Sequence, residues 1–114
     1  MHELSLSEGI VRTALAASGR ERRVTAIAVQ VGALSAVNLS SLEFCMRLVL
    51  DENGLEHAEV RLTPVPAVVE CECGLRYEAK DMFSPCPECG SFFRDVIEGK
   101  DVTIEYVEVE DGQD

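Results

Sequence analysis

Residues 71–90 have the sequence CECGLRYEAKDMFSPCPECG and hold four of the five cysteines in a chain of 114 residues. The later pair, Cys86 and Cys89, has the two-residue spacing of a turn that directs two thiolates at one metal ion. The earlier pair, Cys71 and Cys73, is one residue shorter, so its turn must have a different local geometry. Two such turns supply four thiolates, which is the number that a tetrahedral site needs. The stretch therefore predicts a metal-binding module.

The predicted metal is zinc in a structural role. Four thiolates fill the tetrahedron of a zinc ion and leave no position for a catalytic water. Iron in a four-sulfur site is the chemical alternative, and disulfides are disfavoured where the thiol pool is reducing. The cysteine module, residues 67–97, has few aliphatic side chains and is too short to bury a core of its own. Metal binding, which contributes on the order of 10 kcal/mol to folding, is expected to hold it together.

The composition describes an acidic chain without a membrane segment. Asp and Glu number 21 against 10 Lys and Arg, and the net charge of -11 has the wrong sign for binding a nucleic acid backbone. No apolar run approaches the roughly 18 residues of a membrane span, and the chain does not open on a secretory leader. We therefore expect a cytoplasmic protein with neither nucleic acid nor membrane as a partner.

A first amphipathic helix is predicted over residues 4–18. Ser5 and Glu8 have the spacing of a capping box, which would leave the first three or four residues outside the helix, and Gly19 would end it. The predicted buried stripe follows the helical period and consists of Leu6, Ile10, Ala14 and Ala17, with Val11 and Leu15 beside them.

A second helix is predicted to end at residues 53–54, where Asn-Gly follows an apolar pattern. Ser40 and Glu43 offer its capping box. The predicted apolar stripe consists of Phe44, Cys45, Leu48 and Val49. A lone cysteine on such a stripe is usually a small hydrophobic residue, so Cys45 is interpreted as part of the core.

Three strands complete the expected fold. Residues 24–31 alternate with a period of two and are apolar on both faces, which indicates a buried strand. Half-exposed strands are predicted around residues 60–62, stopping at Pro64, and over 102–109. We expect an α+β fold, with a three-stranded sheet carrying two helices on one face and an inserted zinc-ribbon-like module.

This pattern divides the chain into two domains. The α+β domain comprises residues 1–66 plus 98–114, and the zinc-binding module comprises residues 67–97.

The first residues have the donors of a second metal site. A terminal amine, backbone amide nitrogens and an imidazole close chelate rings of the tetragonal kind that suits Ni(II) or Cu(II). The candidate donors are the Met1 amine, the His2 imidazole, and the amides of His2 and Glu3. The alternative is that His2 is simply an exposed terminal residue. His57, the other histidine, has no partner nearby in sequence and is interpreted as structural or solvent-facing.

The chain resembles the HypA/HybF family of hydrogenase maturation nickel chaperones. The resemblance rests on the opening Met-His-Glu-Leu-Ser-Leu, on Cys86-Pro87-Glu88-Cys89-Gly90, and on the closing Val107-Glu108-Val109, and it covers essentially the whole chain. The family usually has two residues inside the first cysteine pair. Alignment on Cys73 places Glu70 at the family's first cysteine, and Cys71 is the remaining thiol.

The resemblance implies a carrier of Ni(II) with two metal sites. Nickel would bind at Met1, His2 and Glu3, and zinc at the cysteines Cys71, Cys73, Cys86 and Cys89. The implied partners are a maturation GTPase and the large subunit of [NiFe] hydrogenase, and for some members urease accessory proteins.

Two other function classes are alternatives to nickel delivery. One is a zinc-ribbon protein-interaction module without nickel delivery. The other is an enzyme that uses the N-terminal metal for hydrolysis, which is disfavoured because no nucleophile–base constellation and no glycine-rich phosphate loop accompanies His2. We therefore expect that the protein is not an enzyme.

Overall fold

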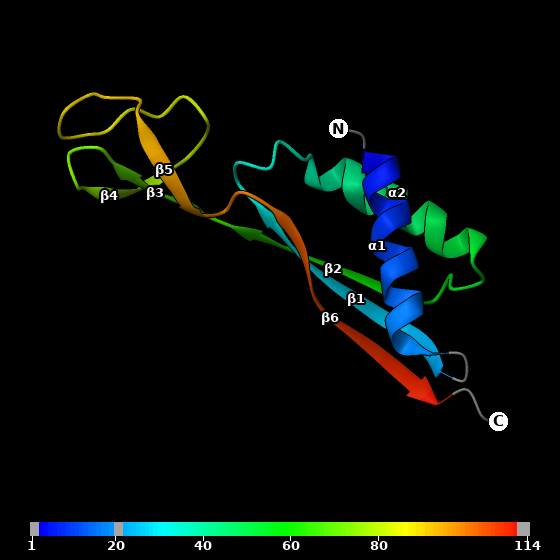
Figure 1. Ribbon diagram of the computed structural model, residues 1–114. Coiled ribbons are helices and arrows are strands. Elements are labelled where there is room, and N and C mark those ends of the chain that lie inside the picture. Colours follow the sequence, from blue (N-terminus) through cyan, green and yellow to red (C-terminus); the bar gives the residue numbers. More distant parts are fainter. Residues whose placement is uncertain (1–2, 20–21, 112–114) are drawn as a thin grey trace. The chain divides into compact units, whose positions relative to one another are not determined.

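The computed structural model describes residues 3–19 and 22–111 and divides the chain into two compact units (Figure 1). The first unit contains the chain up to Gln30, Val37–Thr63 and the chain from Thr103. The second unit contains Val31–Ala36 and Pro64–Val102. Each unit has a three-stranded sheet of its own. No helix within the described residues is long and apolar enough to cross a membrane.

The first unit has the predicted α+β fold. Its elements are α1 (Glu3–Ser18), β1 (Arg22–Gly32), α2 (Leu39–Glu52), β2 (Glu59–Val65) and β6 (Val102–Asp111). The strands form a sheet in the order β2-β1-β6, and the two helices cover one face of it (Figure 1). The predicted order of helices and strands is therefore confirmed.

The central strand β1 carries the core of this unit. Ala26, Ile27, Ala28 and Val29 are all at most 2% exposed, which confirms a strand that is buried on both faces. The helices add to the core Ile10, Val11 and Ala14 from α1, and Leu42, Met46, Val49 and Leu50 from α2. The core thus consists of aliphatic residues and methionine, without an aromatic side chain.

Neither helix uses the capping box that the sequence predicts at its start. Helix α1 begins at Glu3, so Ser5 lies inside it and Glu3 does not precede it. An acidic residue in the first turn is favourable because the N-terminal end of a helix carries partial positive charge. Helix α2 is capped by Asn38, whose side chain accepts a hydrogen bond from the Ser41 amide at 2.9 Å. Asn is as good an N-cap as Ser, and here it replaces the predicted Ser40.

The predicted apolar stripe of α2 is largely wrong. Phe44 is 65% exposed and Leu48 43% exposed, and Cys45 is only partly buried. The buried residues are Leu42, Met46, Val49 and Leu50, which are spaced by four, three and one positions and follow the helical period over 42–50, whereas the predicted stripe spans only the six residues 44–49. In α1, Ala17 is likewise exposed, and Ser7 and Ser18 are buried instead.

The second unit is built around β3 (Ala67–Cys71). This strand pairs antiparallel with both β4 (Arg76–Ala79) and β5 (Arg94–Glu98), in the order β4-β3-β5. Its core is small and consists of Ala67, Val69 and Ala79, against which Leu34, Tyr77 and Val96 pack.

The upstream segment 31–36 joins this unit through backbone hydrogen bonds. The amide of Ala33 donates to the Val65 carbonyl, and the amide of Leu34 donates to the Gly99 carbonyl, each at 2.9 Å. Residues far apart in the sequence therefore close the second unit.

Candidate metal centre

The four cysteine sulfurs of the second unit form one cluster. All of them lie within 4.8 Å of one another. The Sγ atoms of Cys71 and Cys89 are 3.5 Å apart, and those of Cys73 and Cys86 are 3.8 Å apart. A tetrahedron with zinc–sulfur bonds of about 2.3 Å has sulfur–sulfur edges of about 3.8 Å, so the cluster has the dimensions of a tetrathiolate site.

The first cysteine pair is presented by the β3–β4 hairpin. The Cys71 amide donates to the Leu75 carbonyl at 2.8 Å, which encloses a loop of residues 72–74. The Gly74 amide donates to the Cys71 carbonyl at 2.8 Å, and Gly74 has a φ of 97°. A three-residue hairpin loop commonly ends in such a left-handed residue, and glycine adopts it without steric cost. The hairpin thereby brings Cys71 and Cys73 to the cluster despite their short spacing.

The second cysteine pair lies on a turn one residue longer. The Cys86 amide donates to the Ser91 carbonyl at 3.0 Å, and the Gly90 amide donates to the Cys86 carbonyl at 2.8 Å. Gly90 also has a positive φ, of 75°. The two turns are thus alike in how they are closed, and the difference between one and two intervening residues is a difference in loop length.

The thiols have different proton affinities. Hydrogen bonds from the backbone amides of Cys89 and Glu88 lower the pKa of Cys86 to about 7. In Cys71, Cys73 and Cys89 the backbone amide two residues further on lowers the pKa, but burial and hydrogen bonding among the thiols outweigh it and raise the pKa. A cation that binds here must therefore displace protons from thiols whose pKa is raised.

The N-terminal candidates are only partly described. Met1 and His2 lie outside the described residues. The Glu3 carboxylate accepts a hydrogen bond from the Asn38 amide at 3.2 Å. The start of α1 is therefore attached to the N-cap of α2 within the first unit, a contact between residues 35 positions apart that no local sequence pattern indicates.

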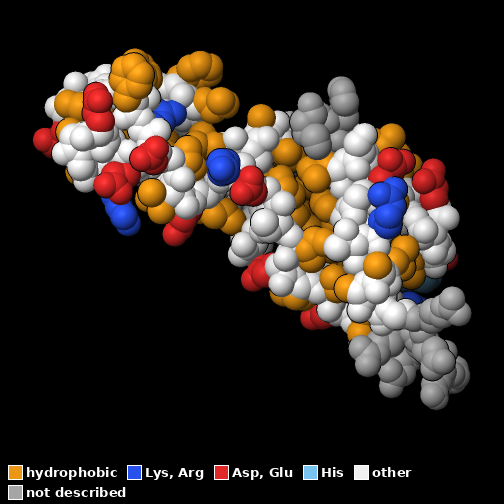
Figure 2. Space-filling model, viewed as in Figure 1, with side chains coloured by type: hydrophobic (Ala, Val, Ile, Leu, Met, Phe, Trp, Pro, Cys, Tyr) orange, Lys and Arg blue, Asp and Glu red, His pale blue; other side chains and the backbone are white. Residues whose placement is uncertain are grey.

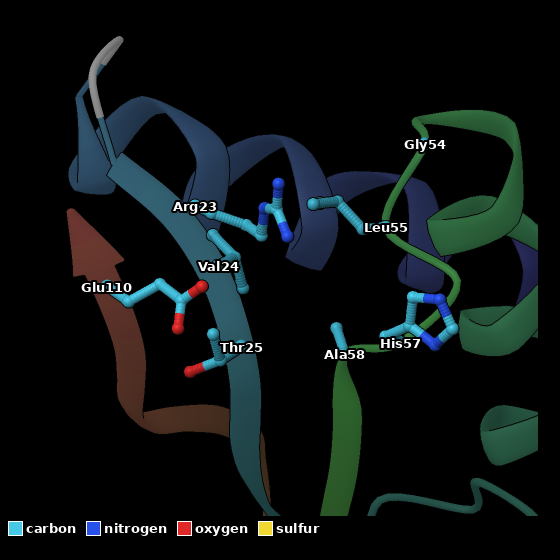
Figure 3. A pocket seen from close by; sticks show the side chains of 8 residues that line it. All are labelled: Arg23, Val24, Thr25, Gly54, Leu55, His57, Ala58 and Glu110. Atoms are coloured by element: carbon cyan, nitrogen blue, oxygen red, sulfur yellow. The ribbon is translucent and has the colours of Figure 1, made fainter. Parts of the chain in front are cut away.

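His57 lies outside the cysteine cluster. It is exposed, in the loop before β2, and it lines a hollow of about 230 Å³ in the first unit together with Arg23, Leu55 and Glu110. Figure 3 shows Arg23 reaching toward Leu55, with His57 on the other side of the hollow. Over residues 3–19 and 22–111, the four cysteines are the one group of three or more His, Cys, Asp or Glu side chains arranged to hold a metal ion.

Comparison with known proteins agrees with the resemblance seen in the sequence. A family model described as hydrogenase/urease nickel incorporation, metallochaperone, HypA matches residues 1–109. The hydrogenase maturation factor HypA of Methanocella arvoryzae is 36% identical over 113 residues, which cover 96% of this chain and 99% of that protein. The protein of the same name from Francisella philomiragia is 32% identical over 109 residues, covering 94% and 97%.

Solved structures share the fold. The solution structure of the Ni metallochaperone HypA from Helicobacter pylori superimposes with a TM-score of 0.68. The match covers 95% of this chain and 97% of that one, at 17% sequence identity.

Proposed function

Because the chain belongs to the HypA family of nickel-incorporation metallochaperones, we propose that it binds Ni(II) and delivers it during maturation of [NiFe] hydrogenase. The observation that carries this proposal is the family match over residues 1–109, which includes both the Met-His-Glu start and the cysteine cluster. Urease is a second candidate target, since the family description includes it. The proposed partners are a maturation GTPase, the hydrogenase large subunit and, for urease, its accessory proteins, in the cytoplasm.

Zinc is the ion that we assign to Cys71, Cys73, Cys86 and Cys89. The sulfur–sulfur distances of 3.5 and 3.8 Å support a tetrahedral ion with thiolate ligands. Four protein ligands leave no open position, so the proposed role is structural. The ion would supply the folding energy that the small core of Ala67, Val69 and Ala79 lacks.

Nickel is assigned to Met1, His2 and Glu3. The proposed donors are the terminal amine, the His2 imidazole and the backbone amides of His2 and Glu3, a nitrogen set that suits tetragonal Ni(II). The Glu3 side chain accepts from the Asn38 amide, which supports a role for the Glu3 backbone rather than its carboxylate in binding nickel. A small terminal chelate releases its ion when the imidazole is protonated or when a partner's ligands compete, as a carrier requires. The proposal involves no catalytic step.

A nickel titration of the zinc-loaded protein tests this assignment. Calorimetry and the Ni(II) absorption spectrum would be compared for the native chain, for His2→Ala and for a chain extended before Met1. The native chain should bind one Ni(II), and both altered chains should lose most of that affinity. His57→Ala is the matched control, because His57 is exposed and remote from Met1 in sequence.

Two results would change the proposal. Retained affinity in the extended chain would remove the terminal amine from the donor set. A native chain that does not bind Ni(II) would leave the alternative function, a zinc-ribbon protein-interaction module without nickel delivery.

A further inference from the structure

The second unit exposes aromatic side chains that the metal site does not use. Phe83 is 79% exposed, Phe93 76%, Phe92 61% and Met82 60%. The chain has four Phe residues in all, and three of them are in this group. Single exposed apolar residues are ordinary, but a concentration of large ones on one module is typical of an interaction surface. Figure 2 shows hydrophobic side chains gathered on this unit.

The two halves of the group lie on either side of the second cysteine turn and are tied together by Arg94. The Arg94 guanidinium donates to the carbonyls of Met82 and Ser84. Arg94 is the first residue of β5 and directly follows Phe93, so the segment before β5 that carries Phe92 and Phe93 is connected to the loop that carries Met82 and Phe83. The two segments that carry the four side chains therefore lie next to each other on one folded unit.

Hydrogen bonds hold each half in place. The Asp81 carboxylate accepts from the Phe83 amide at 2.8 Å and from the Ser84 hydroxyl at 3.2 Å. On the other side the Ser91 hydroxyl accepts from the Phe93 amide at 3.0 Å and donates to Glu72 at 2.8 Å. Backbone that is ordered in this way loses little conformational freedom when a partner binds.

The charge around these apolar side chains limits which kinds of partner could bind there. Three exposed acids form an acidic rim close to them: Asp81 precedes Met82, Glu72 accepts from the Ser91 hydroxyl, and Asp95 follows Arg94, whose guanidinium is occupied by two carbonyls. Lys80 is also exposed, but residues 64–102 carry eight acids against four bases. A second copy of a chain with a net charge of -11 would be repelled, as would nucleic acid or an anionic membrane. An occupant must therefore bring cationic side chains along with apolar ones.

We propose that Met82, Phe83, Phe92 and Phe93 form a docking surface for a partner protein segment in which apolar side chains are flanked by Lys and Arg. The apolar side chains contact the aromatic group, and the basic ones pair with the acidic rim. The acidic rim speeds and selects the encounter, and the buried aromatic rings supply most of the affinity. This surface is independent of the nickel donors of the proposed function.

The test uses the full, zinc-loaded chain and three short synthetic peptides. Each fluorescent peptide has a central Leu-Phe-Leu, and its flanks are Lys and Arg, Ser and Gly, or Glu and Asp. Fluorescence polarisation at physiological salt should show that the basic peptide binds about tenfold or more tightly than the neutral one. When the basic peptide binds, the changes in the protein's amide chemical shifts should centre on residues 82–83 and 92–93.

Matched variants locate the surface. Phe83→Ser combined with Phe93→Ser should weaken the basic peptide about tenfold or more, with zinc content and nickel affinity unchanged. Phe44→Ser is the control, since Phe44 is 65% exposed but lies in the first unit, and it should bind as the unaltered chain does. The proposal is overturned by equal binding of the basic and acidic peptides, by equal binding to the double variant, or by no binding at about 1 mM. Self-association of the native chain that the double variant abolishes would overturn it in favour of a second copy.

Discussion

The two units of the molecule bury very different amounts of apolar surface. The first unit surrounds β1 with large aliphatic side chains and Met46, and β1 itself is buried on both faces. The second unit has a sheet of equal strand number, but its core consists of Ala67, Val69 and Ala79 with three partly buried neighbours. Burial of apolar area stabilises a fold roughly in proportion to that area. The first unit is thus stable through its core, and the second is expected to depend on the ion that we propose for its four cysteines.

Removal of the metal should give the largest effect and separate the two units most sharply. Chelation of the zinc-loaded protein is expected to unfold the second unit, because about 10 kcal/mol of binding energy is lost, and to leave the first unit folded. Amide hydrogen exchange measured residue by residue checks this, with β1 and β3 as reporters. Zinc added back after chelation is the control and should restore protection in β3. Retained protection in β3 after complete chelation would show that the small core is sufficient to keep the second unit folded without a metal ion.

The fold could be predicted to the extent that it depends on local periodicity. Strand β1 is apolar on both faces and was recognisable from residues 24–31, and Gly19 ends α1 as predicted, with a φ of 85°. The buried face of α2 could not be chosen, because its sequence carries two overlapping apolar stripes and the sheet decides between them. The strands of the second unit were not predicted, because β4 and β5 are short and mostly exposed.

The cysteine cluster could be predicted from spacing, but its geometry could not. The sequence identified four thiols, yet whether Cys71 reaches the others depends on the bond from its amide to the Leu75 carbonyl and on the left-handed Gly74. The bond between Glu3 and Asn38 and the pairing of segment 31–36 are long-range contacts without a local signal. The nickel donors remain a prediction, because Met1 and His2 lie outside the described residues.

A large core residue tests the stability of the first unit. Leu42 is fully buried, and Leu42→Ala should lower the free energy of unfolding of this unit by about 2–5 kcal/mol through lost burial and a cavity. Leu48→Ala, on the same helix but 43% exposed, is the control and should cost much less. Urea denaturation followed by β1 amide signals measures both. Similar losses in the two variants would contradict the burial pattern of α2.

A glycine tests how the second unit is closed. Gly99 has a φ of 85°, and a Cβ there would lie 2.6 Å from both the Ala67 Cα and the Pro66 carbonyl oxygen. Gly99→Ala should therefore destabilise the zinc-loaded second unit by about 2–4 kcal/mol, since it adds both backbone strain and overlap. Gly54→Ala is the control for strain alone, because Gly54 has a φ of 74° but no atom within 4 Å of its Cβ position. Denaturation is followed by β3 amides for Gly99→Ala and by β1 amides for Gly54→Ala, because Gly54 lies in the first unit. An unchanged stability of the second unit in Gly99→Ala would mean that the backbone around Gly99 adjusts freely.

The smallest expected effect concerns two buried serines of α1. The Ser7 hydroxyl is fully buried and has no hydrogen-bond partner in the part of the chain that the structure describes, whereas the Ser18 hydroxyl donates to the Leu15 carbonyl at 3.0 Å. Ser7→Ala removes an unpaired polar group and introduces a better helix former, so the free energy of unfolding of the first unit should rise by about 1 kcal/mol. Ser18→Ala removes the hydrogen bond to the Leu15 carbonyl, so it should raise the free energy of unfolding by less than Ser7→Ala does, or lower it. Thermal denaturation of the two variants side by side measures the difference. A loss of stability in Ser7→Ala would mean that the Ser7 hydroxyl is paired in solution, and that this core is more polar than its aliphatic residues indicate.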